Sequence, residues 1–150
     1  MGEKMSQAYD VLIRHGHVID PRNSIDGISD VAVKDGLIAA VGKDLPGTAT
    51  KEIDASGLYV TPGLLDIHLH AFSRFNAWLY PDQHCLPYGV TTCVDTGSSG
   101  WQHFPGFVET VIDTATMRVL AFINIVGAGM AGRCEQDAGE MVPEPCADMI

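Results

Sequence analysis

The sequence predicts an α/β protein in which a small β-rich unit precedes a series of parallel strands connected by helices. Short apolar runs separated by frequent turn residues fill residues 9–60 and are typical of short strands. From residue 60 onward, apolar runs of strand length alternate with segments of helical spacing. That alternation is typical of parallel strands joined by crossovers. We therefore expect one unit over residues 1–59 and a second over residues 60–150.

Composition narrows the class of protein. The 150 residues are 46% hydrophobic and 19% charged, as in folded globular proteins. The net charge is −10 and the nine basic residues form no run, which argues against nucleic-acid binding. No apolar run approaches the roughly 20 residues that span a bilayer. Residues 1–6 are too polar for a secretory signal, and no pair of the four cysteines has C-x-x-C spacing, so we expect a cytoplasmic protein without a zinc ribbon.

The β-rich unit contains one strong hairpin signal. Asp35-Gly36 separates the apolar runs 30–34 and 37–41, and both residues tolerate the positive φ of a type I′ turn. An earlier run, Val11–Ile13, is expected to stop at Gly16. This punctuation predicts short antiparallel strands.

The second unit shows the order of strand and helix more clearly. Strands are predicted over 64–70, over 90–94 with an end at Asp95, and over 118–125, where the apolar run is nearly continuous and indicates burial on both faces. A helical turn is expected between Pro81 and Gly89. Amphipathic helical spacing relates Phe104, Phe107, Val108, Val111 and Ile112. A doubly wound sheet and a barrel both fit this pattern.

The segment 64–70 carries the candidate chemistry. Because side chains alternate along a strand, Asp66, His68 and His70 are expected on one face and Leu65, Ile67 and Leu69 on the other. Histidines at i and i+2 lie roughly 6.5–7 Å apart and can reach one ion at the ~2.0–2.1 Å that zinc requires. The same pattern also occurs on edge strands that merely contact water. The position at the end of a strand that opens a β/α series favours the metal site.

Several segments together resemble the amidohydrolase superfamily. The run from Val60 to His70 resembles its first barrel strand, and residues 53–59 resemble the segment that leads into that strand. Asp10 to Asp20 and Asp35-Gly36 resemble the start of its β-sandwich domain. Tyr88–Thr92 and Gly97–Trp101 resemble the dihydroorotase-like deacetylase branch.

This resemblance implies a fold and an activity. Residues 1–59 would be the N-terminal part of a β-sandwich, and residues 60–150 the first three β/α units of a TIM-like (β/α)₈ barrel, which is incomplete in this chain. The activity would be hydrolysis of an amide, cyclic amide or acyl ester by metal-bound hydroxide, with one or two divalent metals, usually zinc. His68 and His70 would be the first-strand ligands, and Asp66 would orient them.

Two departures from the family matter. Dihydroorotases tend to have an arginine where this chain has Phe72, so a neutral or differently charged acyl substrate is expected, unless Arg74 replaces that arginine. The family takes a carbamylated lysine, two more histidines and an aspartate base from later strands. The 150 residues offer no candidates for these, and no catalytic residue is assigned. The alternative is a catalytically inactive, truncated chain that acts as a binding or oligomerising fragment.

The remaining candidates are single residues near the expected strand ends. Arg74, Asp95 and Asn124 are candidate substrate contacts, although Asp95 can equally cap a loop and Asn124 can satisfy backbone groups. His84 and His103 are more often solvated than catalytic. The expected partners are a small acyl substrate and a second copy of the chain, with neither nucleic acid nor membrane.

Overall fold

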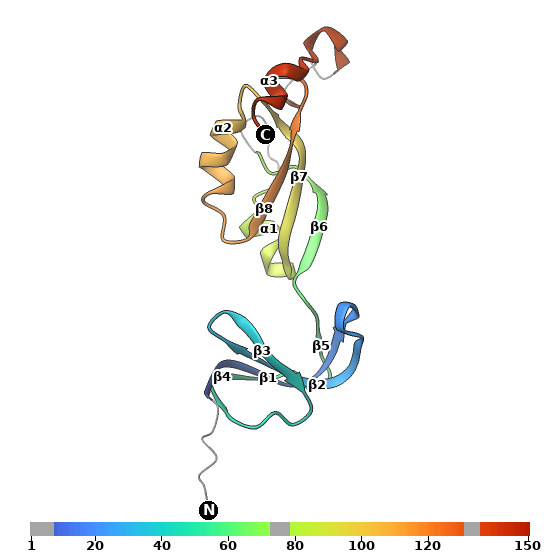
Figure 1. The fold of residues 1–150 in the computed structure, drawn as a ribbon, viewed down its shortest axis with the longest axis vertical. Helices are drawn as coiled ribbons and strands as arrows, with labels where there is room; N and C mark the ends of the chain where they lie inside the picture. Colours follow the sequence, from blue (N-terminus) through green and yellow to red (C-terminus); the bar gives the residue numbers. More distant parts are fainter. Residues whose placement is uncertain (1–7, 73–78, 131–135) are drawn as a thin grey trace, which may run out of the picture. The chain divides into compact units, whose positions relative to one another are not determined.

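The computed structural model describes residues 8–72, 79–130 and 136–150. The chain divides into two compact units, Met1–Pro62 and Gly63–Ile150, and each has its own sheet (Figure 1). The first sheet contains β1 (Ala8–Asp20), β2 (Ile25–Lys34), β3 (Leu37–Gly42), β4 (Thr48–Asp54) and β5 (Tyr59–Val60), with the short 3₁₀ helix η1 (Pro21–Asn23) between β1 and β2.

The first sheet is mixed rather than antiparallel. Its order is β3-β2-β1-β4, with β5 also paired to β1. The β1–β2 and β2–β3 pairs are antiparallel, whereas β4 and β5 both run parallel to β1. The expectation of a purely antiparallel unit is therefore wrong. The connections 43–47 and 55–58 bring β4 and β5 back alongside β1, which turn residues alone do not indicate.

Two turn predictions had different outcomes. Asp35 and Gly36 have φ of 51° and 73° between the paired residues Lys34 and Leu37, so the predicted hairpin turn is confirmed. The expected stop at Gly16 is wrong, because β1 continues for 13 residues through a register shift between Ile13 and Gly16. A Cβ at Gly16 would overlap the Val60 side chain, so glycine is needed for the approach of β5.

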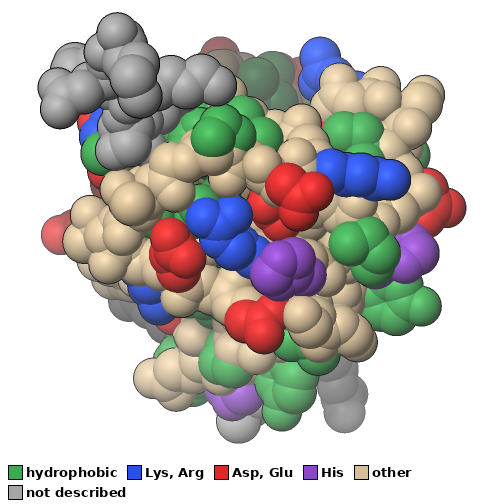
Figure 2. All heavy atoms as spheres, turned by 90° about the horizontal axis from the view of Figure 1, so that it is seen from below, with side chains coloured by type: hydrophobic (Ala, Val, Ile, Leu, Met, Phe, Trp, Pro, Cys, Tyr) green, Lys and Arg blue, Asp and Glu red, His purple; other side chains and the backbone are tan. Residues whose placement is uncertain are grey.

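A buried aspartate joins three segments of the first unit. The Asp30 carboxylate accepts hydrogen bonds from His15 N at 2.9 Å and Leu45 N at 3.0 Å, and it pairs with Arg14 at 3.2 Å. His15 has a φ of 60° at the register shift in β1, so Asp30 satisfies a backbone group that the sheet leaves unpaired. Figure 2 shows a face of the molecule on which basic, acidic and histidine side chains lie next to one another.

The second unit contains a three-stranded parallel sheet in the order β6-β7-β8, which confirms the predicted parallel arrangement. Its elements in chain order are β6 (Leu64–Leu69), α1 (Pro81–His84), η2 (Leu86–Tyr88), β7 (Val90–Gly100), α2 (Phe104–Phe107), the π-helical turn η3 (Val108–Ile112), β8 (Arg118–Asn124), η5 (Ala138–Glu140) and α3 (Pro143–Ala147). The strand predicted to end at Asp95 continues to Gly100.

One face of this sheet carries the core and the other is open. Phe107 of the predicted amphipathic helix is fully buried and packs with Cys93 and Val119 of β7 and β8. The alternate residues of β8, Leu120 and Phe122, are 42% and 64% exposed. Burial of β8 on both faces, which the sequence predicted, is therefore wrong for the described residues.

Replacing Asp30 tests the pH dependence of the first unit. Burial alone would raise the pKa of Asp30, but hydrogen bonds from the His15 and Leu45 amides and the charge of Arg14 outweigh it and lower that pKa. Its stabilising contribution is therefore present above the ordinary aspartate pKa of about 3.9 and is lost as the pH falls toward the lower folded value. We expect Asp30→Asn to reduce stability at neutral pH and to flatten its decline in acid, measured by urea unfolding at a series of pH values. Asp26→Asn, an exposed change in the same strand, is the control, and an equal flattening in both variants would contradict the prediction.

Candidate metal centre

Two histidine rings meet at the carboxyl end of β6. The ring centroids of His68 and His70 lie 5.6 Å apart, with the rings at 85° to each other. Leu69 between them is buried in the core shared with the helices. Because neighbouring side chains on a strand point to opposite faces, both histidines lie on the open face of the sheet. His68 is exposed and His70 is partly buried.

A bulge in β6 separates Asp66 from this pair. Asp66 pairs in register with Cys93 and Leu69 with Asp95, so three residues of β6 match two of β7. Asp66 therefore lies on the core face, and with burial and Cys85 it raises the pKa of the Cys93 thiol to about 11. The predicted common face of Asp66 and the histidines is wrong for this reason. Its Oδ1 instead accepts the His68 amide at 3.0 Å within the bulge.

The bulge also changes the expected apolar face. Leu69 is buried as predicted, but Leu65 and Ile67 are 56% and 68% exposed and lie outside the core cluster. Regular alternation would have placed all three against the helices. The apolar face of β6 is thus split between the core and the open face.

A network of buried polar groups supports His70 from β7. The Nδ1 atom of His70 lies 3.1 Å from Ser98 Oγ. The Asp95 carboxylate accepts the Ser98 amide at 2.7 Å through one oxygen and the Ala71 amide at 2.6 Å through the other. Asp95 and Ser98 are both essentially inaccessible to solvent. In this structure Asp95 therefore links the end of β6 to β7, and its predicted contact with substrate stays a prediction.

Asn124 makes the corresponding link from β8 to β7. Its side-chain Nδ2 donates to Gly97 O at 3.1 Å, and its Oδ1 accepts the Val126 amide at 3.0 Å. Thr96 Oγ1 also donates to Leu69 O at 3.4 Å. Polar side chains thus hold together the carboxyl ends of all three strands. The role of Asn124 as a substrate contact, like that of Asp95, stays a prediction.

Two other sequence candidates, His84 and His103, lie on or next to the helices α1 and α2. His84 Nδ1 accepts the Tyr80 amide at 2.9 Å at the start of α1, which is a local contact. His103 is the residue that precedes α2. Arg74 lies outside the described residues.

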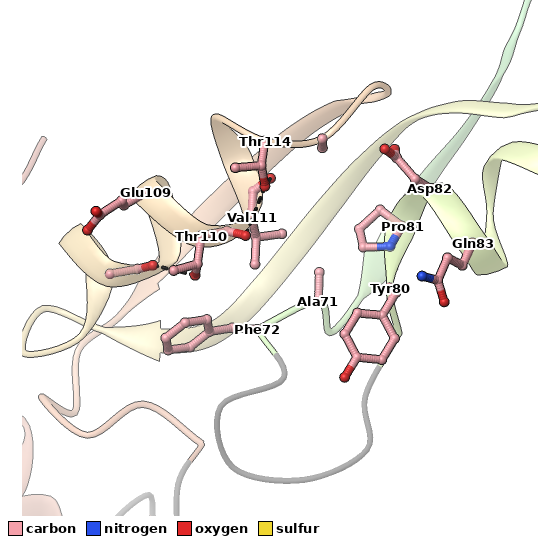
Figure 3. Close-up of a pocket in the computed structure, with 12 residues that line it drawn as sticks. Ala71, Phe72, Tyr80, Pro81, Asp82, Gln83, Glu109, Thr110, Val111 and Thr114 are labelled. Carbon is pink, nitrogen blue, oxygen red and sulfur yellow. Dashed lines mark hydrogen bonds between the residues drawn. The ribbon is translucent and has the colours of Figure 1, made fainter.

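A hollow of about 640 Å³ lies elsewhere in the second unit, between α1 and the α2–η3 helix (Figure 3). Phe72 and Tyr80 point into it from the segments around α1, and Thr110 and Thr114 from the other side. Asp82 on its wall accepts the Thr116 and Met117 amides, which also lowers the pKa of Asp82. No histidine is among the described residues that line this hollow, although Ala71, which follows His70, is one of them.

The centroid separation of the two histidine rings is close to that of two ligands on one metal ion, but the pair does not complete a site. Two imidazoles on one tetrahedral zinc place their ring centroids about 5 Å apart, close to the observed separation. A hydrogen bond from the second ring nitrogen to a side-chain oxygen is the usual support of a metal-binding histidine. Within residues 8–72, 79–130 and 136–150, no group of three or more His, Cys, Asp or Glu is placed to hold a metal.

Comparison with curated proteins finds a deacetylase and an allantoinase among the relatives of this chain. The chain is 37% identical over 108 residues to a deacetylase of Brucella anthropi, a match that covers 70% of this chain and 27% of the relative. It is 39% identical over 144 residues to an allantoinase of Rubrobacter xylanophilus, covering 90% of this chain and 31% of the relative. The chain thus spans about a quarter to a third of the length of these relatives. No family model matches it.

Solved structures of an adenine deaminase and a dihydroorotase share the fold of this chain. An adenine deaminase superposes with a TM-score of 0.78 at 29% identity, covering 93% of this chain and 37% of that one. A dihydroorotase superposes with a TM-score of 0.75 at 26% identity, covering 92% and 39%. Together, these relatives and structures support the amidohydrolase superfamily, of whose members the chain matches the N-terminal portion only. An N-acyl-D-glutamate deacylase of Bordetella bronchiseptica, solved with zinc and a phosphonate inhibitor, shares the fold at 21% identity, with a TM-score of 0.63 and coverage of 95% and 35%.

The superfamily match confirms the predicted fold class. The neighbours are TIM-barrel enzymes, and the parallel sheet β6-β7-β8 lies in the part of this chain that they match. No helix among the described residues is long and apolar enough to cross a membrane.

Sequence reasoning missed Ser98, the residue that contacts His70. The sequence predicts that the strand ends at Asp95, before Ser98, whereas the structure extends β7 to Gly100. The contact spans 28 residues of sequence, which no local pattern encodes. The one usable signal was the aspartate three positions earlier, because a carboxylate commonly caps a nearby backbone amide.

Replacing Asp95 tests the link between β6 and β7. In Asp95→Asn one acceptor oxygen becomes an NH₂ group that faces the Ala71 or the Ser98 amide, so a buried hydrogen bond is lost and a donor is unpaired. We expect a loss of about 1–3 kcal/mol in the free energy of unfolding, measured by urea denaturation. Asp82 also accepts two backbone amides, but at a more exposed position. Asp82→Asn should therefore reduce the free energy of unfolding by less, because water can replace the lost hydrogen bond. Equal losses would show that burial of Asp95 contributes nothing.

Proposed function

We propose that this chain contributes the first two metal ligands, His68 and His70, to a metal-dependent hydrolase that cleaves an amide, a cyclic amide or an acyl ester. The observation that carries the proposal is the pair of rings on the open face at the carboxyl end of a parallel strand. In β/α barrels, active sites lie at that end of the strands. Relatives named deacetylase and allantoinase support the same class of reaction.

Zinc is the metal we propose for this pair. Two neutral imidazoles are typical zinc donors, and the ring separation suits one tetrahedral ion. Bound zinc supplies Lewis-acid polarisation of a carbonyl and lowers the pKa of a water molecule. A catalytic zinc takes about three protein ligands, so further ligands must come from outside the described residues of this chain.

The chain's other residues have supporting roles in this proposal. Asp66 holds the bulge that turns His68 toward the open face, through its 3.0 Å bond to the His68 amide. Asp95 fixes the backbone immediately after His70 through the Ala71 amide. Neither carboxylate lies on the face of the two rings, so we assign neither of them as the catalytic base.

The environment of Phe72 favours a substrate other than dihydroorotate. Phe72 is 3% exposed and packs against Phe107, with ring centroids 5.1 Å apart. It therefore offers no charge to a substrate carboxylate. A neutral or differently charged acyl compound fits this position better, such as an N-acetyl amino acid or an acetyl ester.

A second candidate function is self-association without catalysis. Leu65, Ile67, Leu120 and Phe122 are all exposed on β6 and β8. Exposed apolar surface of this kind drives association when nothing covers it. Light scattering of residues 1–150 across a concentration series distinguishes this candidate, because it requires dimers or larger species that persist in His68→Ala.

Zinc binding tests the proposed metal centre. We expect residues 1–150 to bind zinc weakly, and His68→Ala and His70→Ala each to abolish that binding in titration calorimetry. His84→Ala is the matched control and should leave binding unchanged, because its ring is engaged locally by the Tyr80 amide. Zinc retained by both first-strand variants would refute the assignment.

Activity tests the substrate class separately. With two ligands and no base, residues 1–150 should not hydrolyse N-acetyl amino acids or acetyl esters, since general acid–base catalysis alone typically contributes 10²–10⁴-fold. A form extended by the later strands should hydrolyse them in preference to dihydroorotate. Preference for dihydroorotate would contradict the argument from Phe72.

A further inference from the structure

We propose that Ser98 is a positioning residue that orients the His70 ring and selects Nε2 as its metal-binding nitrogen. The inference rests on the proposed metal centre. Its basis is the contact of 3.1 Å between Ser98 Oγ and His70 Nδ1, which joins β7 to the end of β6.

Ser98 Oγ can pair with either tautomer of His70, and in the proposed arrangement it accepts the hydrogen bond from Nδ1–H. When Nδ1 carries the proton and donates it to Ser98 Oγ, the lone pair of the ring is on Nε2. A metal needs that lone pair, and the partner of the other nitrogen sets which one is available. The hydrogen bond between His70 Nδ1 and Ser98 Oγ also restricts rotation of the ring. Ser98 thus supplies both the tautomer and the orientation that a shared ion between His70 and His68 requires.

Ser98 can act in this way because its own backbone is held from both sides. Its amide donates to the Asp95 carboxylate at 2.7 Å, and its carbonyl accepts the Met130 amide at 3.2 Å. Gly129 packs so closely on Ser98 that a Cβ there would overlap the Ser98 carbonyl oxygen. With 1% exposure, Ser98 is also shielded from water that would compete for its hydroxyl. The hydroxyl is therefore held in a fixed position beside His70 Nδ1 rather than on a mobile surface group.

Nuclear magnetic resonance on the unmodified chain tests the tautomer without any metal. In residues 1–150 with ¹⁵N-labelled histidine, held above the pH at which histidine is protonated, long-range ¹H–¹⁵N correlations distinguish Nδ1–H from Nε2–H. We expect the His70 signals, assigned with His70→Ala, to report Nδ1–H. An Nε2–H signal for His70 would overturn the proposal.

Measured metal affinity tests whether Ser98 supports metal binding by His70. Ser98→Ala should weaken Co²⁺ and Zn²⁺ binding about 10–100-fold, as loss of a support for a metal-binding histidine typically does, and should move His70 toward Nε2–H. Ser98→Thr, which keeps the hydroxyl, should restore both. Ser99→Ala is the matched control, because Ser99 is equally buried but its hydroxyl donates to Gly100 O at 3.0 Å.

The outcomes separate this inference from the proposed function. If the wild-type chain binds no metal through His68 and His70, the proposed metal centre fails, and the tautomer measurement still decides the role of Ser98. If metal binds and Ser98→Ala changes neither affinity nor tautomer, the role of Ser98 fails and the metal centre stands. Equal losses in Ser98→Ala and Ser99→Ala would show a packing effect and would also refute the positioning role.

Discussion

The histidine site depends on one buried carboxylate. Where β6 ends, the Ala71 amide has left the sheet ladder, and at Ser98 the pairing of β7 with β8 shifts register. Both amides would be buried without partners, which costs about 1–3 kcal/mol each. Asp95 satisfies the two with its two oxygens. These two hydrogen bonds also fix the backbone on either side of the His70–Ser98 contact. Asp95 therefore contributes both to the stability of the sheet and to the geometry of the candidate metal centre.

The bulge in β6 determines which side chains reach the open face. Without it, a strand with Leu69 in the core would also direct Leu65 and Ile67 there and leave Asp66 beside the histidines. With the extra residue, Asp66 lies on the core face, near Cys85 and Cys93. Leu65 then joins Leu120 and Phe122 among the exposed apolar groups. Bulges are frequent beside active sites because they redirect single side chains in this way.

The sequence predicted those features that local rules determine. Asp35-Gly36 identified its turn because positive φ at both positions is a property of the dipeptide, and the parallel order of β6, β7 and β8 followed from the alternation of strand and helix. The face of Asp66 could not be predicted, since it depends on how β6 pairs with a strand some 25 residues away. The extent of β7 was missed because Gly97–Gly100 has loop composition, although distant partners hold it in the sheet.

The path of the chain after His70 explains why residue 72 does not bind a substrate carboxylate in this chain. Capture of the Ala71 amide by Asp95 directs the chain toward the helices, where Ala71 and Phe72 enter the core. Phe72 gains a fixed place against Phe107, and an arginine there would bury its charge in an apolar cluster at high cost. Phenylalanine at position 72 therefore contributes to the helix layer and places no cation at the end of β6. In the proposed function, recognition of an acyl substrate comes from groups other than residue 72.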